Sequence, residues 1–293
     1  MKEPLTFEEQ VEKLRDHNIV VPDAEFALMC LKNINYYHLR GYWLSFEENN
    51  QIKDGTTFNN IWDAYLLDTE LKALLFQYIL PIESKLKTQL TQLLTYNYGP
   101  YAYENIELFS NEQRFRKANN DINNEIERAK KRKERFVMHN INKYGKLPMW
   151  ACIELITFGG ISLIYQNLNP NVKTNSRSNK SIKAEIASQY GTTPYYLESW
   201  LRHLCYVRNL CAHQSRFYNN SILIPPKLRN TEKKYKKSKQ LTTFIILKNI
   251  YNAEWNESWK DFLLDLTDVF KKYPKVSLQP MGFPNNWLEI LSE

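Results

Sequence analysis

Residues 57–98 read TFNNIWDAYLLDTELKALLFQYILPIESKLKTQLTQLLTYNY, and their apolar side chains recur mostly at intervals of three and four. That spacing places the apolar side chains on one face of a helix, and Thr57 is a suitable N-cap for it. Pro81 should kink the helix, because proline removes one i to i−4 hydrogen bond and clashes with the preceding turn. The stretch predicts one long helix that ends near Gly99 and Pro100.

Other segments carry signals for the start of a helix. Residues 6–9 form a capping box, in which Thr6 and Glu9 can bond each other's backbone amides. Cap-and-proline pairs predict starts at Pro22–Asp23 and at Thr193–Pro194. A further helix is expected around residues 259–272. Only 8 glycines occur in the chain, which suits long helices, so the predicted fold is nearly all-α.

Several stretches have no clear period. Residues 36–43 are aromatic and basic and are expected to form a turn or a short strand. Residues 221–226 suggest a brief strand, and residues 241–247 a strand or the start of a helix. A helix should open at residues 147–150, with Gly159–Gly160 inside it or ending it. The polar stretch from Asn169 to Ser181 is expected to be a loop.

The chain has 293 residues, of which 43% are hydrophobic and 14% aromatic. It is long enough to bury a sizeable core, and its aromatic content argues against disorder. The 39 Lys and Arg residues exceed the 32 Asp and Glu residues, which gives a formal net charge of +7. This balance fits either a phosphate-binding protein or a basic surface without a ligand.

The positive charge is concentrated in two segments. Residues 128–135 include Lys130, Lys131 and Arg132. Residues 227–239 include Lys233, Lys234 and Lys236 and are expected to form a mobile loop. Both segments are candidate RNA-binding surfaces whose cations could contact successive phosphates. The alternative for each is a charged surface that is only exposed to solvent and binds no ligand.

Cysteine spacing and hydropathy exclude some classes of protein. Cys30, Cys152, Cys205 and Cys211 include no C-x-x-C pair, so we expect no zinc site and no cofactor. Each cysteine lies in an apolar context, as expected of core residues in a reducing compartment. No signal peptide is visible at the start, and no apolar stretch reaches the roughly 20 residues of a spanning helix. We therefore expect a cytoplasmic protein without a membrane partner.

The segment with the clearest chemistry runs from Arg208 to His213. Asn209 and His213 are four residues apart and share a helix face. A neutral imidazole can accept a proton from a ribose 2′-hydroxyl near neutral pH, and the Arg208 fork can hold phosphate oxygens as charge develops there. Asn209 can orient the imidazole or a substrate oxygen. The alternative is that Arg208 and His213 only cap or brace a helix end.

Two longer stretches carry a family resemblance. Residues 150–165, WACIELITFGGISLIY, resemble the W-x3-E-x2-[ST]-F-G-x-[LI]-S-x-[LI]-Y motif of the Abi-like, abortive-infection proteins of bacteria. Residues 208–219, RNLCAHQSRFYN, resemble the R-N-x-x-A-H-x-x-R-x-[WY]-N motif of the same family. Residues 36–42 are similar to its N-terminal aromatic element, and Ile82–Glu83 fits as well. The resemblance covers most of residues 5–220.

This family is grouped with the HEPN superfamily of R-x4-6-H proteins, which implies an all-helical bundle, an RNA target and a role in phage defence. By carry-over, Arg208 and His213 match the catalytic pair and Asn209 its polar neighbour. Such proteins usually build one cleft from two copies of the motif, which implies a homodimer here. Gln214 departs from the family, in which a second histidine is common at this position.

The implied organisation is an N-terminal helical and aromatic segment over residues 1–56 and a HEPN-like core over 57–220. A basic loop and a helix that pack on the core follow over 221–293. Other candidate site residues are Arg216 and Arg40 for RNA binding and Glu83 as a group that orients the catalytic pair. His38 and His203 are expected to pack structurally.

Two functions remain open on the sequence. The first is a metal-independent endoribonuclease of a phage-defence or toxin–antitoxin system. The second is a non-catalytic protein that holds a small structured non-coding RNA. A third, a purely structural helical dimer, has less support.

Overall fold

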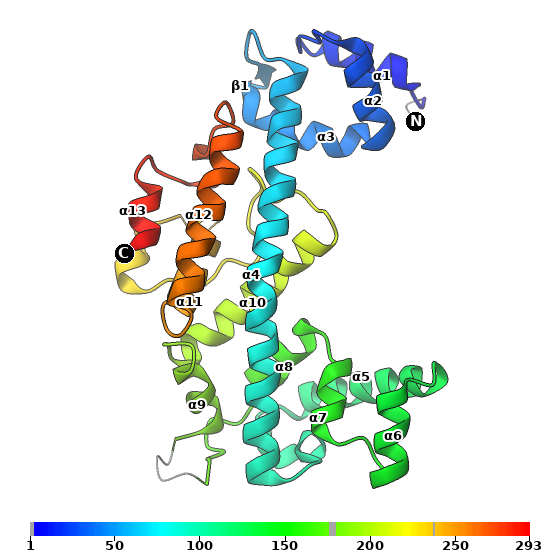
Figure 1. The fold of residues 1–293 in the computed structure, drawn as a ribbon, viewed down its shortest axis with the longest axis vertical. Coiled ribbons are helices and arrows are strands. Elements are labelled where there is room, and N and C mark those ends of the chain that lie inside the picture. The colour runs from blue at the N-terminus through cyan, green and yellow to red at the C-terminus, as the bar shows by residue number, and fades with distance from the viewer. Residues whose placement is uncertain (1–2, 176–179, 237) are drawn as a thin grey trace. The chain divides into compact units, whose positions relative to one another are not determined.

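The computed structural model describes residues 3–175, 180–236 and 238–293. The expected all-α fold is confirmed: helices make up most of the described chain, and its one sheet pairs the two-residue strands β1 (Glu47–Glu48) and β2 (Gln51–Ile52) (Figure 1). No helix of the described residues is both long enough and apolar enough to cross a membrane.

The chain forms two compact units that do not follow its order. Unit 1 contains residues 1–76, 207–245 and 257–293, and unit 2 contains residues 77–206 and 246–256. The division expected from sequence, at residues 56 and 220, stays a prediction. Both ends of the described chain belong to unit 1.

Unit 1 begins with three short helices, α1 (Phe7–Asp16), α2 (Ala24–Asn33) and α3 (Tyr36–Trp43). The predicted capping box of α1 is present, and Asp23 caps α2. The prediction of a turn or strand at residues 36–43 is wrong. Asn35 caps α3 by accepting a hydrogen bond from the Tyr37 amide, at 2.8 Å. Leu39, Tyr42 and Trp43 then form one buried face.

Helix α4 (Phe58–Tyr98) contributes to both units and continues through Pro81 without interruption. Its start is the predicted one, with the Thr57 hydroxyl accepting a hydrogen bond from the Asn60 amide at 3.2 Å. Pro81 is exposed, so its ring faces solvent on the helix surface.

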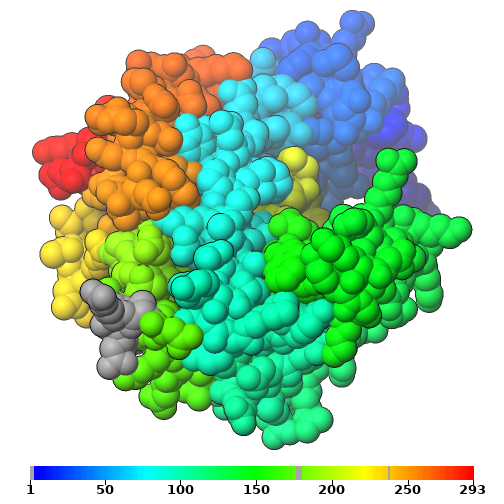
Figure 2. Space-filling view, turned by 60° about the horizontal axis from the view of Figure 1, so that its bottom comes forward, coloured from blue at the N-terminus to red at the C-terminus, as the bar shows by residue number. Residues whose placement is uncertain are grey.

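The last third of the chain adds α11 (Leu241–Tyr251), α12 (Asn256–Lys272) and α13 (Trp287–Ser292), with the short 3-10 turns η5 (Asn230–Glu232) and η6 (Gln279–Met281). Of the two possibilities for residues 241–247, the helix is the one found. No strand forms at residues 221–226, where Pro225 and Pro226 lack amide donors. Helices α12 and α13 lie side by side in Figures 1 and 2, and the rings of Phe270 and Trp287 are 5.1 Å apart.

Unit 2 is built around the second part of α4. The chain continues through the turns η2 (Ala102–Glu104) and η3 (Ile106–Leu108) into α5 (Glu112–Lys131) and α6 (Arg135–Tyr144), and the following elements are α7 (Met149–Cys152), η4 (Ile153–Leu155), α8 (Phe158–Asn167), α9 (Ile182–Ser188) and α10 (Pro194–Ala212). The helix expected from Pro148 breaks at Ile156–Thr157, and Gly159–Gly160 lies in the first turn of α8. A Cβ at Gly160 would lie 2.7 Å from Cγ2 of Ile156, which explains the need for glycine. Residues 176–179, inside the expected loop, lie outside the described residues.

Candidate functional site

Helix α10 contributes to both units, with residues 194–206 in unit 2 and residues 207–212 in unit 1. The R-x4-H segment consists of the end of α10 and the residue after it, and it belongs to unit 1. Val207 and Cys211 point into the core, and burial raises the pKa of the Cys211 thiol to about 12, so this cysteine is a packing group. Arg208 is half-buried, whereas Asn209 and His213 are exposed. The segment therefore presents its polar side chains at the surface of the unit.

The helix end is held by a Schellman motif. The Ser215 amide donates to the Leu210 carbonyl at 2.9 Å, and the Gln214 amide to the Cys211 carbonyl at 3.2 Å. Gln214 takes the left-handed conformation that this motif requires, with φ of 54°. His213 is the first residue beyond the helix, and its amide still bonds the Asn209 carbonyl at 3.0 Å.

Arg208 and Asn209 are in contact with each other. The Arg208 guanidinium lies over the Phe76 ring, 5.8 Å from its centroid, and Nη1 donates to the Asn209 amide oxygen at 3.3 Å. On an ideal helix, the side chains of Arg208 and His213 would point in directions about 140° apart around the helix axis. Among the described residues, the imidazole makes no hydrogen bond or ion pair, so it is accessible to a ligand.

A buried carboxylate, which the sequence did not single out, anchors the segment after the motif. Asp68 of α4 accepts hydrogen bonds from the Tyr218 amide at 2.7 Å, the Phe217 amide at 3.2 Å and the Tyr42 hydroxyl at 2.7 Å. Lys72, one helical turn further on, forms an ion pair with it at 3.3 Å. The exposed fractions of the two charged side chains are 1% for Lys72 and 0% for Asp68.

Lys72 links this cluster to the motif. Its Nζ donates to the Gln214 carbonyl at 3.4 Å, directly after His213. The available sequence signal was the Asp68–Lys72 pair itself, two opposite charges four residues apart in an apolar stretch. Such a pair is typical of an exposed helix face, which is why it did not stand out.

Arg216 connects the motif segment to α3. Its Nη1 donates to the carbonyls of Gly41 at 2.7 Å, Asn219 at 3.1 Å and Tyr218 at 3.4 Å. A Cβ at position 41 would lie 2.9 Å from Arg216 Nε, so the guanidinium can pack here only because residue 41 is glycine. Arg40 and His38 lie on the same helix. Burial and the charges of Lys72 and Arg216 lower the pKa of His38, against the opposing effect of Asp68.

The other predicted RNA-binding cations fall on two surfaces. Lys130 and Arg132 lie at the end of α5, where they pair with Glu127 and Glu134, each at 2.7 Å. Lys131 is beside them and exposed. Lys233, Lys234 and Lys236 are exposed in unit 1, and none of them has an ion pair among the described residues. Long side chains stand out from the green part of the chain, which includes α6, in Figure 2.

Glu83 and His203 belong to unit 2. Glu83 is buried at 8% exposure and lies 3.9 Å from Lys87 in an ion pair. His203 is fully buried, as expected of a packing residue. Among the described residues, no three His, Cys, Asp or Glu side chains form a group that could hold a metal ion.

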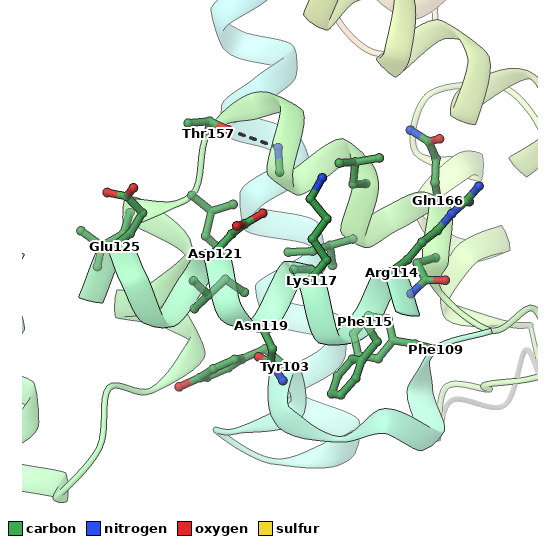
Figure 3. A pocket seen from close by; sticks show the side chains of 18 of the residues that line it. Tyr103, Phe109, Arg114, Phe115, Lys117, Asn119, Asp121, Glu125, Thr157 and Gln166 are labelled. Atoms are coloured by element: carbon green, nitrogen blue, oxygen red, sulfur yellow. Dashed lines mark hydrogen bonds between the residues drawn. The ribbon is translucent and has the colours of Figure 1, made fainter. Parts of the chain in front are cut away.

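Unit 2 also contains a cavity of about 680 Å³ between α5 and α8 (Figure 3). Lys117 of α5 extends toward α8, with Arg114 and Asp121 on the same side of α5, while Asn119 and Tyr103 lie on the other side. The apolar part of the lining includes Leu94, Phe115, Ile122, Leu155, Ile156 and Leu163. This cavity could not be predicted from the sequence, because its lining comes from segments far apart in the chain.

A family model described as Abi-like protein matches residues 29–219. The chain belongs to the Abi-like protein family. The resemblance drawn from residues 150–165 and 208–219 is thereby confirmed, and the family suggests a role in abortive infection, a defence against phage. No curated protein and no solved structure matches this Abi-like chain. The matched range contains α3, Asp68, Lys72 and the whole R-x4-H segment.

Proposed function

We propose that this Abi-like protein is a phage-defence endoribonuclease that works without a metal ion, as a member of the HEPN superfamily. The observation that carries the proposal is the placement of Arg208, Asn209 and His213 at the end of α10. The imidazole there is exposed, and the guanidinium is oriented by Phe76 and Asn209. The family's link to abortive infection supports the biological role.

The chemistry assigned to these residues is transesterification. The His213 imidazole takes the proton of a ribose 2′-hydroxyl, and the resulting oxygen attacks the adjacent phosphorus. The bond from phosphorus to the 5′-oxygen breaks, and that oxygen takes a proton from an imidazolium. Arg208 stabilises the charge on the non-bridging oxygens. The products are a 2′,3′-cyclic phosphate and a 5′-hydroxyl.

Two imidazoles serve this scheme better than one, because one group must accept a proton while another donates one. Each chain carries a single R-x4-H segment. In the proposal, a second copy of the chain supplies the other His213 and Arg208, so that the active protein is a homodimer with one shared cleft.

The second candidate function is RNA binding without cleavage, with a small structured RNA held by the same surface. The exposed Lys233, Lys234 and Lys236, which have no ion pair among the described residues, favour this function, because such cations can follow an RNA backbone without any chemistry. Both functions fit a toxin–antitoxin system in which a bound RNA keeps the nuclease silent.

Cleavage of labelled RNA in the presence of EDTA tests the nuclease. Replacement of His213 by Ala should lower the rate by roughly 10²–10⁴-fold, and Arg208→Ala by roughly 10²–10³-fold. The exposed His139 and Arg116, replaced by Ala, are the matched controls and should leave the rate unchanged. Mass spectrometry should find a 2′,3′-cyclic phosphate on the upstream product.

Cleavage that survives both active-site replacements would move the active centre elsewhere. RNA that co-purifies with the protein but is never cut, under any activating condition, would favour the binding function. Sedimentation over a range of protein concentrations tests the homodimer, and a monomer at the concentrations where cleavage occurs would contradict it.

A further inference from the structure

Unit 1 has a surface hollow beside α3 with a volume of about 740 Å³. We call it the α3 hollow, and its lining consists of Asn35, Tyr37, His38, Arg40, Gly41, Leu44 and Arg216. The volume falls in the range of roughly 300–1,000 Å³ that is usual for small-ligand sites. Arg216 belongs to the motif segment, so the hollow adjoins the chain that leaves the candidate catalytic site.

The charges around the hollow favour an anion. Arg40 and Arg216 both line it, and no carboxylate does. Neither arginine has an ion pair among the described residues, although exposed cations elsewhere on the chain are commonly paired, as Arg116 is with Glu112 at 2.6 Å. Guanidinium groups of this kind bind phosphate through two parallel hydrogen bonds.

Arg216 lines the hollow, and its guanidinium is held by backbone carbonyls. Its Nη1 is fixed by the Gly41, Tyr218 and Asn219 carbonyls, while Nε and Nη2 make no hydrogen bond to another described residue. A fixed guanidinium with free donors loses little side-chain entropy when it binds a ligand. His38 lines the same space, and its lowered pKa keeps the imidazole neutral.

Tyr37 provides a flat surface at this site. Its side chain is 78% exposed, and its ring contacts no other aromatic ring among the described residues. Asn35 fixes the start of α3 by accepting a hydrogen bond from the Tyr37 amide. Proteins that bind single-stranded nucleic acid combine exposed aromatic rings, on which unpaired bases stack, with nearby basic side chains.

We propose that the α3 hollow binds one unpaired nucleotide of RNA, with its base stacked on Tyr37 and its phosphate held by Arg40 and Arg216. The choice of RNA as the ligand rests on the proposed function. The hollow makes the protein select single-stranded segments, because a paired base has no free face to offer. It acts as a subsite for the strand and takes no part in the chemistry at His213.

The test measures binding in a His213→Ala background, which separates affinity from cleavage. The probe is a fluorescently labelled, unstructured eight-nucleotide RNA, alone and annealed to its complement. Tyr37→Ala should weaken binding of the single strand by roughly 5- to 150-fold, while Tyr37→Phe should stay within about two-fold, since the stacking surface is kept. Tyr96 is also 78% exposed but lies in unit 2, so Tyr96→Ala is the matched control.

Arg40→Gln should reduce the slope of log affinity against log salt by about 0.7, the value of one lost phosphate contact on a single strand. The proposal is overturned if Tyr37→Ala binds like Tyr96→Ala, or if Tyr37→Phe loses as much affinity as Tyr37→Ala. It is also overturned if the duplex binds as tightly as the single strand.

Failure of this proposal and failure of the nuclease are distinguishable. If the protein never cuts RNA but its affinity for RNA depends on Tyr37, the proposed role of the α3 hollow is supported and the proposed nuclease is rejected. If the protein cuts RNA and Tyr37→Ala binds RNA with unchanged affinity, the proposed nuclease is supported and the proposed role of the α3 hollow is rejected.

Discussion

Asp68 ties three segments of unit 1 together through one carboxylate. It bonds Tyr42 of α3 and the amides of Phe217 and Tyr218, and it faces Lys72 on its own helix. Burial and the adjacent Asp68 carboxylate raise the pKa of Tyr42 well above its usual range, so its hydroxyl remains a donor. The backbone after His213 is therefore placed by a residue about 150 positions earlier in the chain.

Replacement of Asp68 by Ala should lower the free energy of unfolding by about 3–5 kcal/mol, because it leaves the Lys72 ammonium buried without its partner. Adding Lys72→Met should recover part of that loss, since the unpaired charge is then gone. Urea unfolding measures both variants. Asp268→Ala, at an exposed pair with Lys271, is the control and should change stability by less than about 1 kcal/mol. A similar small change in Asp68→Ala would contradict the role given to this residue.

His38 should make stability depend on pH. Its pKa in the folded protein lies below the ordinary 6.5, so the unfolded chain binds the proton more readily. The contribution to stability is complete above about pH 6.5 and is lost as the pH falls below it, toward the lowered folded value. Replacing His38 with Gln should flatten the dependence between about pH 7 and about pH 5 in denaturant titrations. The same slope in His38→Gln and in the exposed control His139→Gln would count against this.

The C-terminal end of α10 contains a strained backbone conformation. Gln214 has a φ of 54°, a conformation that costs most residues about 1 kcal/mol relative to glycine. Gln214→Gly should therefore raise the stability of unit 1 by up to about 1 kcal/mol, and Gln214→Val should lower it. Thermal unfolding of the three proteins checks the order. Equal melting temperatures would mean that the Lys72 contact to the Gln214 carbonyl, rather than φ, sets the helix end.

The predictability of the elements follows from their surroundings. α4 and α10 were predictable, because long helices with one buried face keep their period over many residues. α11 was ambiguous, since Leu241 to Leu247 is buried on every side and so has no exposed polar face that would reveal a helical period. α3 was missed because aromatic residues and Gly41 are weak helix formers, although the Asn35 cap was a usable signal.

Some residues of the candidate site could also be predicted from the sequence, and others could not. Arg208, Asn209 and His213 could be found from the chain, because they are close together in sequence and belong to a specific motif. Asp68, Lys72 and Tyr37 could not, because their roles depend on residues brought to them by folding. A charge or a ring looks the same in sequence whether it is exposed, buried or beside a hollow.

The two basic segments, residues 128–135 and 227–239, differ in how many of their cations are already paired with carboxylates. Lys130 and Arg132 are already paired with carboxylates, whereas Lys233, Lys234 and Lys236 are exposed and without ion pairs among the described residues. Phosphate contacts by the first pair require an existing ion pair to break. The segment in unit 1 is therefore the stronger candidate for contact with RNA.

Changing Lys233, Lys234 and Lys236 to Gln together should lower the slope of log affinity against log salt by about 2 for single-stranded RNA. The same change at Lys130, Lys131 and Arg132 should lower it by no more than about 0.7, the share of Lys131. Fluorescence anisotropy over a series of salt concentrations gives both slopes. A larger effect from the α5 triple variant would reverse the assignment of the RNA-binding surface.

Unit 1 is assembled from three separate stretches of chain, and this affects the order of events during translation. The segment after the motif is held by Asp68, which is synthesised before it. It is also held by Gln240, which is synthesised after it and whose side-chain amide donates to the Phe217 carbonyl at 2.6 Å. The Tyr218 hydroxyl donates to the Ser277 carbonyl at 2.8 Å. Synthesis at ~5–20 residues per second puts several seconds between Tyr218 and Ser277. During that interval a nascent chain already contains Arg208 and His213 but lacks the contacts from Gln240 and Ser277 that hold the segment after them.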